Sequence, residues 1–337
     1  MASLVFELVV MLVIILIASE LFTNALEHLG ATLKISEGVT GSLFAAVGTA
    51  LPETMVPLLA IFAGTTNAQL NEEVGVGAIL GAPLMLATLS TCLMAIAAFP
   101  SRGASGLVNP ERSGFVRDLD FFLFAFVVAA AAMFVPEEAR YVRAGLSAIL
   151  VTAYFVYILL TLRASEKLVG EGHGTRAHEK VFLSRIGFPE NVATTLIQLA
   201  AGLTLLIVGA KGFINGVEGV SKLMGMSPLL LSLLIIPIAT ELPEKVNSIL
   251  WIRRGKDTLA FGNITGAMVF QGTLLPAIGI MLTPWQPRKE VLSGVIVTLL
   301  AAAWLRFNVQ SNGVRLRMLL INGLLYVVFL GWTLVRS

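Results

Sequence analysis

The chain has 337 residues, of which 56% are hydrophobic and only 13% are charged, and its mean hydropathy is +0.87. Its 23 Lys and Arg nearly cancel its 21 Asp and Glu, which excludes a nucleic-acid-binding protein that depends on a basic surface. This composition also excludes a disordered chain, argues against a soluble two-domain enzyme, and predicts an all-α integral membrane protein.

Ten apolar stretches of helical length follow one another, and we expect each to cross the membrane as a helix. They are continuous runs and not alternating ten-residue segments, which excludes an outer-membrane barrel. The first run is expected to be a retained helix, because no basic segment precedes it. The ten stretches lie near residues 2–25, 36–63, 74–98, 119–135, 140–162, 190–214, 227–251, 258–282, 289–306 and 317–335.

A polar segment at 164–189 divides the chain at its midpoint and is expected to be a linker. Fifteen Lys and Arg lie on the same side of the membrane as this segment and seven on the other. Cytoplasmic loops carry the excess of Lys and Arg, so we expect the linker in the cytoplasm and both termini outside a prokaryotic-type plasma (inner) membrane. Glu72 and Glu73 are expected as solvated charges in an outside loop.

The two halves repeat each other at an offset of 191 residues. Chance matching of apolar runs would not align polar residues in register, so we interpret the halves, 1–163 and 190–337, as two five-helix repeats. Because each half contains an odd number of spans, the second enters the membrane from the opposite side, which predicts an inverted repeat. The aligned pairs include Asn24 with Asn215, Glu27 with Glu218, Thr49 with Thr240, and Leu51-Pro52-Glu53 with Leu242-Pro243-Glu244.

Each repeat places a Pro-Glu pair inside an apolar run. A proline within a helix frees the carbonyl four residues earlier, here that of Gly48 or Ala239. These carbonyls, the hydroxyls of Thr49 and Thr240 and the carboxylates of Glu53 and Glu244 would meet near the midplane as an all-oxygen shell suited to Na⁺ or Ca²⁺. The alternative is a simple helix kink with a glutamate that reaches the interface. Two such carboxylates in the middle of apolar spans are hard to explain by packing.

The two Thr-x-Leu-Pro-Glu segments, each followed by a glycine-rich stretch (Val74–Gly81 and Gly262–Gly266), resemble the alpha repeats of the sodium/calcium exchangers of the cation/Ca²⁺ antiporter superfamily. This resemblance covers both halves. It implies ten transmembrane helices, ion exchange by alternating access, and ion sites among broken helices two, three, seven and eight. It further implies that Glu53 and Glu244 are the central metal ligands, with Thr49, Thr240 and Asn263 at family motif positions.

The chain departs from the family motifs where side-chain oxygens are expected. The missing oxygens put a three-sodium-per-calcium stoichiometry in doubt, although Gln271 remains a plausible neutral ligand. The replacements are Ala50 and Glu241 for the serine of the two motifs, Gly77-Ala78-Ile-Leu-Gly81-Ala82-Pro83 for the helix-three pattern Gly-Asn-x-x-Gly-Ser-Asn, Ala267 and Met268 for the Ser-Asn pair of helix eight, and Leu86 at a later ligand position.

Two charged residues appear instead inside helix seven. Glu241 and Lys245 are four residues apart with the acid first, so both can lie on one helix face as a favourable pair. The Lys245 ammonium would replace a lost cation or titrate with transport, and the alternative is a lysine that extends to the interface and neutralises Glu241.

These features predict a secondary cation antiporter and not an enzyme: one that exchanges Ca²⁺, or a similar cation, for Na⁺ or H⁺. The alternative is a monovalent-cation/proton exchanger on the same scaffold, and a channel or a receptor is less favoured. No cofactor is expected, and the expected partners are the lipid bilayer and small inorganic cations, with no nucleic acid and no required protein partner. No phosphate-binding Gly-x-x-x-x-Gly-Lys motif or catalytic triad occurs in the sequence.

Overall fold

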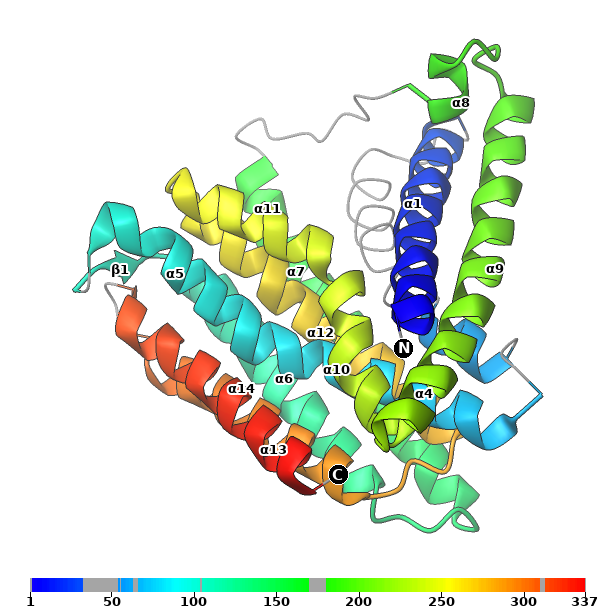
Figure 1. The fold of residues 1–337 in the computed structure, drawn as a ribbon. Helices are drawn as coiled ribbons and strands as arrows, with labels where there is room; N and C mark the ends of the chain where they lie inside the picture. Colours follow the sequence, from blue (N-terminus) through cyan, green and yellow to red (C-terminus); the bar gives the residue numbers. More distant parts are fainter. Residues whose placement is uncertain are drawn as a thin grey trace. The chain divides into compact units, whose positions relative to one another are not determined.

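The computed structural model describes residues 2–32, 54, 56–62, 66–103, 105–169, 180–309 and 313–336. This part of the chain is almost entirely helical (Figure 1). A short antiparallel pairing joins β1 (Leu107–Val108) to β2 (Val314–Arg315). Six of the described helical segments are long and apolar enough to cross a membrane, and Pro228–Ile238 is a shorter apolar helix.

Each predicted span outside helix two coincides with an observed helix, although several of these helices extend beyond the predicted span at one or both ends. The predicted helix at 36–63 lies largely outside the described residues, although 56–62 are helical. The helices are α1 (Ala2–Thr32), α4 (Ala68–Met85), the π-helical turn η2 (Leu86–Ser90), α5 (Thr91–Arg102), α6 (Arg112–Ala132), α7 (Arg140–Val169), α8 (Phe182–Arg185), α9 (Val192–Met224), α10 (Pro228–Thr240), α11 (Leu242–Arg253), α12 (Asp257–Leu282), α13 (Lys289–Phe307) and α14 (Leu316–Arg336).

One placement in the sequence analysis is wrong. Glu72 and Glu73 lie inside α4 and not in a loop, because the helix begins at Ala68, before the apolar run that marks its membrane-spanning part. Glu73 is also buried and forms an ion pair with Arg288. Pairing with an arginine explains why a charged residue is tolerated there.

The helices form two compact units, residues Met1–Asn71 with Leu159–Met224, and residues Glu72–Ile158 with Gly225–Ser337. In the first unit α1 packs along α9 (Figure 1). Gly202 and Gly209 of α9 allow this close approach, since a Cβ on either would lie about 2.9 Å from α1 atoms. Asn24 of α1 accepts hydrogen bonds from Gln198 of α9 and from the backbone of Phe182 in α8.

The second unit contains every described residue of the candidate ion site. Its α4 lies against α10 without room for side chains at Gly77 and Gly81, where a Cβ would overlap Ser232 or the Leu233 carbonyl. This pair of glycines four residues apart gives the close helix contact that small residues allow in membranes. The glycine-rich stretch of helix three therefore serves packing against helix seven.

Side chains of α7 and α14 cross to the third helix of the opposite half. Ser147 of α7 donates to the Ala277 carbonyl of α12 over 2.6 Å, and Asn322 of α14 donates to the Ala87 carbonyl of η2 over 2.8 Å. Ala87 and Ala277 both lie in the third helix of their proposed repeat, although not at aligned positions. The last helix of each half thus holds the third helix of the other.

Helices three, seven and eight are irregular to different degrees. Helix seven is divided into α10 and α11 at Glu241, helix three contains η2 after Pro83, and α12 continues through Pro276. Pro276 removes only one backbone donor, so the helix can continue beyond it. Only helix seven is divided among these three, and the candidate site is built around that division.

Candidate ion-binding site

The division of helix seven places an acidic residue in the interior of the second unit. Glu241 has φ −87° and ψ 3°, outside the helical range, because it caps the start of α11, whose second residue, Pro243, cannot donate a backbone hydrogen bond. Glu241 has no exposed surface. A buried carboxyl requires hydrogen-bond partners or a counter-charge, so its neighbours define the site.

Gln271 of α12 is one of those neighbours. Its Nε2 donates to Glu241 Oε1 over 2.7 Å, and both side chains are fully buried. The two oxygen-bearing groups come from helices seven and eight, 30 residues apart in sequence. Gln271 was predicted as a neutral ligand, and the structure brings it into direct contact with Glu241.

Lys245 extends into the same interior. Its Nζ donates to the Pro237 carbonyl over 2.9 Å and lies 2.7 Å from the sulfur of Met85, and the residue is 8% exposed. Pro237 belongs to α10 and precedes Lys245 by eight residues, so the ammonium reaches back past the break towards α4. The ammonium is therefore held in the interior of the second unit, between α10 and α4.

Two further candidates make different contacts. The Thr240 hydroxyl donates to the Ile236 carbonyl of its own helix over 3.2 Å and is buried. Asn263 donates to Ser248 over 3.1 Å and is half-buried. Asn263 precedes Gln271 by eight residues, or about 12 Å along the helix axis, so these two side chains lie at different depths.

The contacts between α11 and α12 define their register. Glu241 meets Gln271 and Ser248 meets Asn263, as in two antiparallel neighbours joined by a tight turn. Backbone position 244 therefore lies at the level of residues 267–268. At this level α12 carries Ala267 and Met268, which offer no side-chain oxygen.

The surface of helix three in this interior is apolar. Ala78, Ala82 and Leu86, which the sequence resemblance aligns with ligand positions, are all buried, and Met85 beside them contacts the Lys245 ammonium. A thioether sulfur is a weak acceptor, in contrast to the amide and hydroxyl oxygens that hard cations prefer. Helix three therefore supplies packing and not side-chain oxygens to this half of the site.

The remaining predicted ligands cannot be placed. Gly48, Thr49 and Glu53 lie outside the described residues, and for Ala239 and Glu244 only the backbone is described, within α10 and α11. Among the described residues, no group of three His, Cys, Asp or Glu could hold a metal ion. The sequence analysis missed Ser248 and Met85, because neither residue type marks an ion site without its spatial partners.

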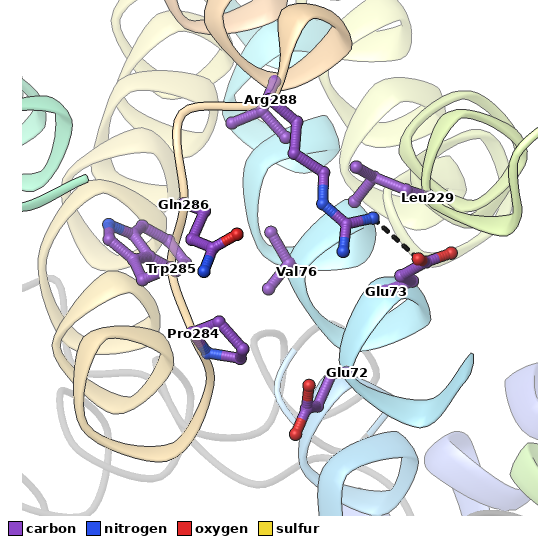
Figure 2. Close-up of a pocket in the computed structure, with 9 residues that line it drawn as sticks. Glu72, Glu73, Val76, Leu229, Pro284, Trp285, Gln286 and Arg288 are labelled. Atoms are coloured by element: carbon purple, nitrogen blue, oxygen red, sulfur yellow. Dashed lines mark hydrogen bonds and ion pairs between the residues drawn. The ribbon is translucent and has the colours of Figure 1, made fainter. Parts of the chain in front are cut away.

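A second polar location lies at the end of α4, in the same unit. A pocket of about 30 Å³ is lined by Glu72, Glu73, Gln286 and Arg288 together with apolar residues (Figure 2). Figure 2 shows Arg288 directed at Glu73, and their closest atoms are 2.6 Å apart. This ion pair joins the start of α4 to the loop before α13, away from the break in helix seven.

The family model that matches this chain describes exchangers, and one matching relative is named as an antiporter. The family model described as sodium/calcium exchanger protein matches residues 3–163 and 194–335. A putative antiporter, CaxA of Alkalimonas amylolytica, is 24% identical over 274 residues, which cover 81% of this chain and 79% of that protein.

Solved structures of membrane exchangers share the fold. The H⁺/Ca²⁺ exchanger CAX matches with a TM-score of 0.71 and 17% identity over 97% of this chain and 81% of its own. The sodium-calcium exchanger NCX_Mj matches with a TM-score of 0.55 and 16% identity over 98% of both chains. At these identities the likeness concerns the fold, which is the all-helical fold of these exchangers.

Proposed function

Since the chain belongs to the sodium/calcium exchanger family, we propose that it is a secondary antiporter that exchanges Ca²⁺, or a similar cation, for Na⁺ or H⁺ by alternating access. The observation that carries this proposal is the buried Glu241–Gln271 contact at the break in helix seven, in the same helix pair where the buried Lys245 ammonium donates to the Pro237 carbonyl. Interrupted helices with buried polar groups are the places where such transporters bind ions.

The transported cation would be held by the two Pro-Glu motifs. Glu53 and Glu244 are proposed as its principal ligands, and Thr49, Thr240 and the carbonyls of Gly48 and Ala239 complete an oxygen shell. A shell of this kind suits Ca²⁺, which takes six to eight oxygen ligands. No cofactor is needed for such exchange, because the ion gradients supply the free energy.

Lys245 is proposed to act as a resident positive charge. Its ammonium is a buried cation on the Pro237 carbonyl, four residues after the buried Glu241. A charge that never leaves the protein reduces the number of cations that the site must bind. This supports exchange coupled to protons or to fewer Na⁺ ions, and it also favours the second candidate, a monovalent-cation/proton exchanger.

The membrane placement follows the charge of the loops. We propose a prokaryotic-type plasma (inner) membrane, with the linker 164–189 in the cytoplasm and the termini outside, from the excess of Lys and Arg on the linker side. Labelling of single cysteines introduced at Ser337 and in the linker, in intact cells, tests this orientation.

Isotope uptake into proteoliposomes tests the proposed ligands. The purified protein, with Glu53→Gln and Glu244→Gln variants, is assayed for Ca²⁺ uptake under imposed Na⁺ and pH gradients. We expect exchange by the wild type and loss of at least about 90% of it in each variant, since each change removes a charged ligand. Normal transport by both variants would show that the site lies elsewhere.

The Lys245→Met variant tests the resident charge. Methionine keeps the length of the side chain but removes the ammonium, so the net charge moved in each cycle changes by about one elementary charge if another cation takes its place. Charge movement is measured on proteoliposomes adsorbed to a solid-supported membrane. An unchanged ratio of charge to transported Ca²⁺ in Lys245→Met contradicts this role.

A further inference from the structure

A second buried carboxyl lies on α6, outside the proposed ion site. Asp118, in the second turn of α6, is 4% exposed, and its Oδ2 lies 2.7 Å from the Thr265 hydroxyl of α12. Phe115 and Phe261, one turn before each of these residues, pack edge to face with ring centres 5.2 Å apart. This surrounding makes an isolated charge costly and therefore makes the partners of Asp118 decisive.

Polar groups face Asp118 from three helices. On α6 itself, the Arg117 guanidinium lies 3.7 Å from Oδ1. Tyr157 of α7 lies near the carboxyl, and its ring centre is 5.9 Å from the Arg117 guanidinium. On α12 the partner is Thr265. The helix α13 also packs on α6, but its Arg306 pairs with the exposed Asp120 over 2.6 Å.

The Thr265 hydroxyl can serve both charge states of this carboxyl. Its oxygen lies 2.7 Å from Asp118 Oδ2 and 2.9 Å from the Phe261 carbonyl, and it has only one proton to donate. When Asp118 is ionised, Thr265 donates to the carboxylate. When Asp118 carries a proton, the acid donates to Thr265, whose own proton turns to Phe261. Rotation of one hydroxyl therefore keeps the hydrogen bond between Thr265 and Asp118 Oδ2 in either state.

We propose that Asp118 is a proton-binding group of the transport cycle, separate from the ion site in helix seven. The proton comes from the side of the membrane on which α6 begins, which the loop charges predict to be the cytoplasm. Thr265 follows Asn263 by two residues and precedes Gln271 by six. Protonation of Asp118 therefore changes a hydrogen bond on α12, the helix that carries both Asn263 and Gln271. This inference rests on the proposed exchange function for its role, but proton binding itself can be measured without transport.

The matched pair Asp118→Asn and Asp120→Asn tests the role in transport. Asparagine keeps the shape of the acid and can still hydrogen-bond Thr265, but it cannot ionise. If one proton on Asp118 controls transport, the slope of log rate against cytoplasmic pH below the optimum falls by about one in Asp118→Asn. Asp120→Asn, two residues away on the same helix and exposed, is expected to keep the wild-type pH profile. A wild-type profile in Asp118→Asn overturns the proposal.

Infrared difference spectroscopy of the purified protein in liposomes tests proton binding directly. Acidification is expected to produce a carboxylic acid carbonyl band that is absent from Asp118→Asn and present in Asp120→Asn. The Thr265→Val variant, which keeps the acid but removes the hydroxyl, should shift this band, and Thr265→Ser should restore it.

The two measurements separate the two proposals. A band that depends on Asp118 in a protein without any exchange would refute the proposed function and leave the proton site standing. Exchange by the wild type, with the band unchanged in Asp118→Asn, would refute the proton site alone.

Discussion

Two Gln–Glu contacts in the second unit differ almost only in their surroundings. Gln271 donates to Glu241 over 2.7 Å without exposure of either residue, and Gln286 donates to Glu137 over 3.1 Å in an exposed loop. Water can replace the second contact but not the first. Only the buried Glu241 therefore needs protein groups to offset the loss of hydration of its carboxyl. The comparison teaches that the position of an acid relative to lipid and water decides whether it can take part in ion binding.

The largest effect is expected from removing the amide of the buried contact. Gln271→Leu leaves Glu241 without the Gln271 hydrogen bond and should lower the free energy of unfolding by about 1.5–3 kcal/mol, as for hydrogen bonds to charged groups. Gln286→Leu is the control and should change it by less than about 0.5 kcal/mol. Denaturant unfolding in detergent micelles measures both. Equal effects of the two changes would remove the distinction between the contacts.

A second expectation concerns the packing that encloses the buried contact. In Gly81→Ala the new Cβ would overlap the Leu233 carbonyl of α10, and overpacking of this kind costs about 1–3 kcal/mol. Gly331→Ala in α14 is the control, because its Cβ would meet nothing within 4 Å and alanine favours a helix. The midpoints of thermal unfolding should fall for the first variant and not for the second. No fall in Gly81→Ala would show that α4 and α10 do not pack closely.

The ion pair between Glu73 and Arg288 is intermediate in exposure between the two Gln–Glu contacts, with side chains 10% and 40% exposed. Arg288→Gln should destabilise the protein by no more than about 1 kcal/mol, and added salt should reduce the difference from the wild type. The unfolding midpoint at low and high NaCl concentrations measures this. If added salt does not change the destabilisation caused by Arg288→Gln, the pair behaves as a buried contact and not as an exposed one.

The smallest effect is expected at Glu111, which caps α6 in water. Its carboxylate accepts from the backbone amides of Ser113 and Gly114, both over 2.7 Å. Burial acts to raise the pKa of Glu111, but these hydrogen bonds and Arg117 outweigh it and lower the pKa. Because the folded pKa is below the unfolded one, the stabilisation is present above the unfolded value and is lost as the pH falls through the folded value.

Glu111→Gln should therefore lower the unfolding midpoint slightly at neutral pH and equal the wild type at acidic pH. Thermal unfolding measured from about pH 7 down to about pH 3 checks this, since the ordinary glutamate pKa is about 4.3. The exposed Glu138→Gln serves as the control. A difference that grows on acidification would contradict the sign derived for Glu111.

Hydropathy predicted most of the fold, because apolar runs of helical length report directly on the lipid environment. It placed helices seven to ten within two residues of their observed bounds, but one end of each of helices three to six lies six to ten residues beyond the prediction, where polar residues continue the helix past the apolar run. Glu73 is such a case: its burial depends on Arg288, 215 residues later, which no local pattern reveals.

The candidate site was predictable as a set of residues but not as a set of contacts. Glu241, Gln271 and Lys245 were all selected as charged or polar residues within apolar runs. Their contacts depend on the antiparallel register of α11 and α12 and on the approach of Met85 from α4, both of which are tertiary. Asp118 was passed over because it adjoins the start of an apolar run, where acids usually face water.

The most direct test of exchange by this protein is Ca²⁺ counterflow in proteoliposomes that contain only the wild-type chain, with Na⁺ and pH gradients imposed separately. The account predicts that uptake of external Ca²⁺ is driven by an outward gradient of at least one of the two ions and is abolished in Glu244→Gln. Ca²⁺ flux that responds to neither gradient would contradict coupled exchange and indicate a channel.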